Sequence, residues 1–145
     1  MQRDLLIKWH FPHPPEKVWE CLTNPQLIEQ WLMKNDFKPI VGHKFQFHTK
    51  PIPKMGFDGI VNCEVLEITH GQRLVYTWKG GPKPGVVELD TILIWTLAEK
   101  DEGTEIILEH KGFKGWKNYI TSIIMAGGWR KHIPRRMGKL LNEMK

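Results

Sequence analysis

Two titratable side chains fall on strand faces that are otherwise apolar. Tyr76 alternates in phase with Leu74 and Trp78, and His110 lies in phase with Leu108. A buried hydroxyl or imidazole needs a hydrogen-bond partner, which a ligand, the backbone or water can supply. An imidazole also titrates near neutral pH, so His110 and Tyr76 are candidates for acid–base catalysis as well as for ligand binding. Asn62 and His48 have the opposite phase, and we expect both to be solvated.

Other catalytic chemistries find little support. The only serine, Ser122, lies on a predicted helix without the strand–turn–helix elbow of a hydrolase nucleophile. Cys63 lies in mid-strand, where an inert thiol is expected. A proline-containing turn separates His10 from His13, and no third metal ligand accompanies them. Gly80-Gly81 lies in a hairpin rather than before a helix, so it is no phosphate loop. We expect no metal and no cofactor.

Aromatic residues suggest a binding role. Seven tryptophans occur in 145 residues, and four of them, Trp9, Trp78, Trp95 and Trp129, are predicted to face inward. They could line a slot for an apolar ligand or simply fill the core. The candidate ligand-binding residues, taken from the inward faces of strands and helix, are Phe45, Phe47, Val61, Cys63, Tyr76, Trp78, Leu93, Trp95, Leu108, His110, Ile120, Ile124 and Gly128.

Composition is that of a globular protein with a sizeable core, at 41% hydrophobic and 26% charged residues. Cys21 and Cys63 are expected to be reduced and buried, although a disulfide between them stays open. The net charge of +5 gathers near the C-terminus, but no nucleic-acid-binding motif accompanies it, so nucleic acid is not an expected partner.

The N-terminal segment and the apolar runs of the sequence bear on the cellular location of the protein. The segment Met1–Lys8 lacks a long apolar stretch and a small-residue cleavage site, and no apolar run approaches the ~20 residues of a membrane span. We therefore expect a cytoplasmic protein that does not engage the membrane.

Hydrophobic periodicity defines the elements. A period of two over Leu5–Phe11 predicts the first strand. Either Pro14 or Pro15 begins a first short helix, and Asn24-Pro25 begins a second. Further period-two segments predict about five strands, and short turns between them indicate an antiparallel meander.

Three- and four-residue spacing then predicts one long helix from about Trp116 to Glu143. Its apolar stripe includes Ile120, Ile123 and Ile124. Pro134 should kink or split this helix, and Gly127-Gly128 would allow close approach by the sheet or a ligand.

The order of elements predicts an α+β fold. A curved antiparallel sheet with one apolar face needs a cover, and only the C-terminal helix is long enough. The sheet should wrap around that helix, with the two short helices after the first strand closing one end. No internal repeat or domain boundary is evident, so residues 1–145 are expected to form a single domain.

Motifs along the whole chain are similar to those of a known family. They are Pro14–Trp19, Leu22–Pro25, Ile28–Leu32, Val41–Phe45, Gly59–Val61, Val65–Ile68, Leu74–Trp78, Gly103–Glu105, His110–Phe113 and Gly128-Trp129 with Leu140-Leu141. In this order they resemble the START-like SRPBCC superfamily, and within it the activator of heat-shock protein 90 ATPase homologue family. Pro134 departs from the family pattern.

The resemblance implies a helix-grip fold, as in birch-pollen-allergen-like proteins. Members of the superfamily bind lipids, sterols, polyketides and hormones, and some are cyclases or hydrolases. The leading hypothesis is a non-catalytic binder of a hydrophobic small molecule between sheet and helix. The alternatives are an enzyme using His110 and Tyr76, and an interaction module, either a homodimer or a partner of a chaperone in the stress response. The last would need an exposed apolar or charged patch, for which the C-terminal basic cluster is the candidate.

Overall fold

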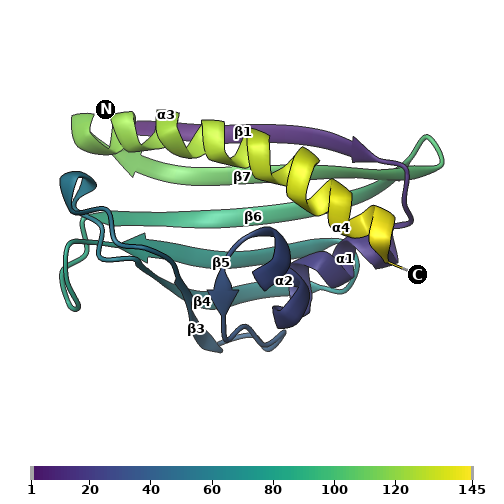
Figure 1. The fold of residues 1–145 in the computed structure, drawn as a ribbon, viewed down its shortest axis with the longest axis horizontal. Coiled ribbons are helices and arrows are strands. Elements are labelled where there is room, and N and C mark those ends of the chain that lie inside the picture. The colour runs from purple at the N-terminus through teal and green to yellow at the C-terminus, as the bar shows by residue number, and fades with distance from the viewer. Residues whose placement is uncertain (1, 145) are drawn as a thin grey trace.

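The computed structural model describes residues 2–144 and has the predicted α+β architecture (Figure 1). Strand β1 (Gln2–Phe11) leads into helices α1 (Pro15–Thr23) and α2 (Pro25–Trp31). Asn24 caps α2 by accepting a hydrogen bond from the backbone N–H of Gln26 at 3.0 Å. Both helices therefore begin where the proline and asparagine signals place them.

Six further strands complete the sheet. They are β2 (Lys34–Asn35), β3 (Lys44–His48), β4 (Ile60–Thr69), β5 (Arg73–Gly80), β6 (Leu89–Lys100) and β7 (Gly103–Lys114). The order across the sheet is β1-β7-β6-β5-β4-β3-β2, and every pairing is antiparallel. The two-residue β2 was not predicted because it is too short to show a period. The proline-rich segment before β4 forms the short helix η1 (Pro53–Met55).

A continuous C-terminal helical segment crosses the concave face of the sheet. It consists of α3 (Gly115–Lys131), the π-helical turns of η2 (His132–Met137) and α4 (Gly138–Glu143). The expected disturbance at Pro134 is thus a wider turn: the N–H of Gly138 reaches the carbonyl of Ile133, five residues back. A π-helical turn accommodates a residue without an amide donor while the helix continues.

The inward face of α3 differs from the predicted one. Ser122, Ala126 and Trp129 are buried against the sheet, whereas Ile120, Ile123 and Ile124 are 49–51% exposed. The expectation that these isoleucines form the buried stripe is wrong. Apolar residues occur on all sides of α3, so the spacing of the isoleucines does not identify its buried side. The small side chains of Ser122 and Ala126 let α3 approach the sheet closely.

Two further expectations also fail. Trp9 has the inward phase of β1 but remains 45% exposed, because it lies in an open groove beside Pro134 and Arg135. The sheet does not approach Gly127 or Gly128 closely, since no atom outside the local helix backbone lies within 4 Å of a Cβ added to either residue.

No helix among residues 2–144 has the length and apolar character needed to cross a membrane. Both cysteines are free and buried. Burial raises the pKa of the Cys21 thiol to about 12 and that of Cys63 as well, so neither is an activated nucleophile.

Candidate functional site

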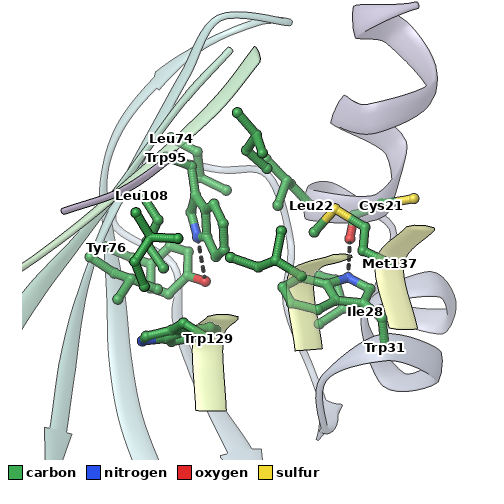
Figure 2. Close-up of a cluster of buried hydrophobic side chains, with 14 of the residues drawn as sticks. Cys21, Leu22, Ile28, Trp31, Leu74, Tyr76, Trp95, Leu108, Trp129 and Met137 are labelled. Carbon is green, nitrogen blue, oxygen red and sulfur yellow. Dashed lines mark hydrogen bonds between the residues drawn. The ribbon is translucent and has the colours of Figure 1, made fainter. Parts of the chain in front are cut away.

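The centre of the space between helix and sheet is filled by tryptophans (Figure 2). Trp129 of α3 packs edge-to-face on Trp78 and on Trp95, with ring centroids 5.5 and 5.7 Å apart. Trp31 of α2 also packs edge-to-face on Trp95, with ring centroids 5.8 Å apart. The aromatic residues that could have lined a central slot therefore occupy it.

His110 lies in the middle of a series of hydrogen bonds that runs from Trp129 to the Trp78 carbonyl. The indole N–H of Trp129 donates to His110 Nδ1 at 3.2 Å. His110 Nε2 lies 2.8 Å from the Thr91 hydroxyl, which itself donates to the Trp78 carbonyl at 2.7 Å. An indole nitrogen can only donate, so Nδ1 must be unprotonated and Nε2 must carry the proton.

These hydrogen bonds and the burial of the ring hold the His110 imidazole in its neutral form. Burial lowers the pKa of His110 to about 3, because no carboxylate compensates the charged form. Both ring nitrogens and the Thr91 hydroxyl already have partners. The arrangement therefore fixes the register of β5, β6, β7 and α3 and leaves no proton free for transfer at neutral pH.

Tyr76 is similarly enclosed. Its hydroxyl accepts a hydrogen bond from Trp95 Nε1 at 3.1 Å, and burial raises its pKa. The Tyr76 ring packs against Phe45 with centroids 5.2 Å apart. Ser122 is also committed, since its hydroxyl donates to the Tyr119 carbonyl at 2.6 Å.

A pocket of about 230 Å³ opens at one end of the sheet, beside η1 and the first turns of α3. Its apolar lining comes from Met33, Ile52, Met55, Phe57, Val61, Trp78, Leu89, Ile124 and Met125. Its polar side chains are Thr49, Glu88, Asn118 and Thr121. Asn118 is held in place because its side-chain amide donates to the Glu88 carbonyl at 2.9 Å. We refer to this space as the end pocket.

The candidate ligand-binding residues divide between this pocket and the core. Val61, Trp78 and Ile124 line the end pocket. Ile120 faces solvent, and Gly128 is half-buried on α3. The others are buried in the core: Phe45, Phe47, Cys63, Tyr76, Leu93, Trp95, Leu108 and His110. As expected, Asn62 and His48 are exposed.

Sequence reasoning missed most of the pocket lining. Ile52, Met55 and Phe57 lie in or beside the proline-rich segment before β4, where prolines disfavour a central strand. Three of the six methionines, Met33, Met55 and Met125, line the pocket. Methionines gathered near a proline-rich loop could have drawn attention to it, because methionine suits adaptable apolar surfaces.

Candidate metal ligands lie apart from one another in the described part of the chain. Within residues 2–144 no group of three or more histidine, cysteine or acidic side chains is arranged to hold a metal ion. His10 and His13 make separate contacts, to the Lys100 carbonyl at 2.8 Å and to Asn142 at 2.9 Å.

Residues 12–142 match the family model described as activator of Hsp90 ATPase homolog 1-like protein. The chain belongs to this family. The resemblance seen in the sequence motifs is thereby confirmed, and the helix-grip arrangement of Figure 1 agrees with it.

Solved structures show the same fold. Protein MLL2253 from Mesorhizobium loti is 33% identical, with a TM-score of 0.86 and 99% of each chain covered. CalU16 from Micromonospora echinospora is 20% identical, with a TM-score of 0.74, covering 98% of this chain and 78% of the other. DynU16, from the dynemicin biosynthetic locus, is also 20% identical at a TM-score of 0.74, covering 97% of this chain and 47% of the other. No curated protein matches the chain.

Proposed function

We propose that the protein binds a small, largely apolar molecule in the end pocket. The observation that carries this proposal is the lining: a concave apolar surface with a few polar side chains at fixed positions, as in ligand sites generally. The volume of about 230 Å³ suits a molecule of one or two rings or a short acyl chain rather than a sterol. The occurrence of this fold in a protein from a biosynthetic locus is compatible with such a role.

The polar groups of the pocket would orient the ligand. Thr49 offers a hydroxyl group, and Thr121 offers its hydroxyl oxygen as an acceptor because it donates to the Lys117 carbonyl at 3.1 Å. Asn118 offers an amide oxygen, since its side-chain N–H is engaged with the Glu88 carbonyl. These groups suit a ligand with one hydroxyl or amide and an otherwise apolar body. Trp78 forms the inner wall, where its ring separates the pocket from His110 at a centroid distance of 5.6 Å.

Methionine methyl NMR gives a direct test. In protein labelled at the methionine methyl groups, 1-naphthol and a short fatty alcohol should shift Met33, Met55 and Met125. Met137 is fully buried away from the pocket and serves as an internal control. Saturable shifts confined to the three pocket methionines would support the proposal. No shift with any member of an aromatic and acyl library would overturn it.

A filled pocket provides the matched variant. Thr121→Trp places a large side chain in the pocket from the half-buried side of α3, and we expect it to abolish the methyl shifts. Arg136→Trp adds the same side chain at an exposed position of the same continuous helical segment, outside the pocket, and should leave binding unchanged. Equal binding by both variants would place the ligand elsewhere.

Acid–base catalysis, the alternative use of His110 and Tyr76, is not favoured. Both groups are buried behind Trp78 or within the aromatic cluster. Both ring nitrogens of His110 have hydrogen-bond partners, and the Tyr76 hydroxyl oxygen accepts from Trp95. A catalytic group must come within hydrogen-bond reach of the proton that it moves, and the end pocket does not reach either residue.

A further inference from the structure

The outward face of α3 is apolar where a surface helix is ordinarily polar. Trp116 is 69% exposed, and Tyr119, Ile120, Ile123 and Ile124 follow it on the same side of the helix. At 100° per residue these positions lie within about half of the helix circumference. They form a continuous strip over the first three turns, and Tyr119 lies at its boundary with the buried face of Ser122, Ala126 and Trp129.

The strip continues across the mouth of the end pocket. Ile124 lines the pocket together with Ile52 and Met55, which are themselves exposed. Val86 and Val87, also exposed, precede Glu88 and Leu89 of the pocket wall. Figure 1 shows the start of α3, the η1 loop and the β5–β6 loop at the same end of the sheet. We call these nine apolar side chains the α3 face.

The α3 face is larger than the largest exposed apolar patch of an ordinary monomeric protein. From their exposed fractions, these side chains together expose on the order of 800 Å², whereas the largest patch on a monomer is about 300–600 Å². About 800 Å² per partner is what a stable protein interface of standard size buries. The part of the strip around Ile120 and Ile123 carries no charge, which is typical of an interface core. At its edges the Arg3 guanidinium lies 5.3 Å from the centroid of the Tyr119 ring, and Glu88 lines the pocket.

We propose that the α3 face binds the same face of a second copy of this chain, forming a two-fold symmetric dimer. Such an interface is self-complementary, so one apolar face suffices for both partners. The second copy would cover Ile52, Met55 and Ile124 and so close the mouth of the end pocket. The inference concerns the same pocket as the proposed function but does not rest on a ligand being bound.

The surrounding charges give the interface a distinctive salt dependence. Lys114 and Lys117 flank one end of the strip, and Arg130 and Lys131 the other, while no acidic residue occurs between Glu109 and Glu143. Glu88 is the one carboxylate in the lining of the end pocket, so positive charge predominates around the α3 face. These charges repel one another across a two-fold interface. Added salt screens the repulsion and should strengthen the dimer, whereas it would weaken attachment to an anionic lipid surface.

Sedimentation of the full chain from low- to high-micromolar concentration, at low and high salt, tests the proposal. We expect reversible dimerisation that tightens with salt. Ile120→Glu combined with Ile123→Glu should weaken dimerisation about a hundredfold, since it buries unpaired charges at the centre. Ile40→Glu combined with Leu6→Glu alters two equally exposed apolar residues outside the α3 face and should leave the dimer unchanged.

Cross-linking provides a second measurement that does not depend on charge variants. Both natural cysteines are buried, so Ile123→Cys introduces an accessible thiol on the α3 face. Oxidation should yield a covalent dimer with Ile123→Cys and not with Ile40→Cys. A chain that is monomeric at every concentration would overturn the proposal. So would a dimer that survives the double glutamate variant, or salt-weakened binding to phosphatidylserine vesicles through Ile120 and Ile123 in place of dimerisation.

Discussion

At the scale of single residues, the decisive feature is a buried polar chain that satisfies itself. Trp129, His110, Thr91 and the Trp78 carbonyl form consecutive hydrogen bonds without water or ligand. A buried polar group is costly only when it is left unpaired. The strand pattern marks His110 as a candidate catalyst. Its burial is accounted for by a structural role, because its hydrogen bonds join β5, β6, β7 and α3.

Thr91→Val tests that chain with little change in volume. It removes the acceptor for His110 Nε2–H and leaves this donor buried and unpaired, so we expect a loss of about 1–3 kcal/mol in the free energy of unfolding. Urea denaturation followed by tryptophan fluorescence measures the change. Thr96→Val on the same strand is the control, because Thr96 is only half-buried. Equal effects of both variants would show that His110 has no special dependence on Thr91.

The pH dependence of stability should also report on His110. Its pKa lies at about 3 in the folded protein and near 6.5 in the unfolded chain. The unfolded chain therefore binds more protons below about pH 6.5, and stability falls progressively as the pH is lowered from about 6.5 toward about 3. Burial also lowers the pKa of His132, so this residue contributes to the same loss of stability at low pH.

NMR titration separates the two histidines. The His110 ring should stay neutral to below about pH 4, with Nε2 protonated throughout. A ring that titrates near pH 6.5 would contradict the closed hydrogen-bond chain. His132→Gln should remove only part of the pH dependence of the unfolding free energy.

At the scale of elements, the sequence and the structure agree where a pattern allows one solution. Proline at the start of α1 and the Asn24 cap located the helix starts, and period-two segments located the strands. The orientation of α3 could not be obtained in this way, since isoleucines and tryptophans occur all round it. Packing decided it: Ser122 and Ala126 are small enough to lie against the sheet, and Trp129 fills the space among Trp78, Trp95 and His110.

The glycines of α3 yield an element-scale prediction. Gly127 is helical and exposed, and a Cβ added there would meet no other atom within 4 Å. Gly127→Ala should therefore raise the free energy of unfolding by about 0.5–1 kcal/mol through helix propensity and a less flexible unfolded chain.

Gly59→Ala is the opposing case, to be measured in the same denaturation series. Gly59 has φ of 90°, and its Cβ would lie 2.5 Å from the Thr49 carbonyl oxygen, so this substitution should destabilise. Destabilisation by Gly127→Ala would indicate that the outer side of α3 is covered at that point.

At the scale of the whole molecule, the aromatic centre and the open end perform different tasks. The tryptophan cluster joins α2, α3 and the sheet into one core, and the end pocket remains as the unfilled portion beside η1. The proposed ligand site and the proposed dimer interface adjoin at this end of the molecule. If both hold, the dimer encloses a ligand that the single chain leaves partly open to solvent.

That enclosure predicts reciprocal coupling. A ligand that gains contacts in the dimer must strengthen dimerisation by the factor by which dimerisation strengthens its binding, since linkage is symmetric. Titrating 1-naphthol during sedimentation should lower the dimer dissociation constant several-fold. The double variant at Ile120 and Ile123 should bind 1-naphthol more weakly by about the square root of that change, because a two-fold dimer contains two pockets. In Thr121→Trp, whose pocket is filled, 1-naphthol should leave dimerisation unchanged. Ligand binding and dimerisation that vary independently would show that the partner copy does not cover the mouth of the pocket.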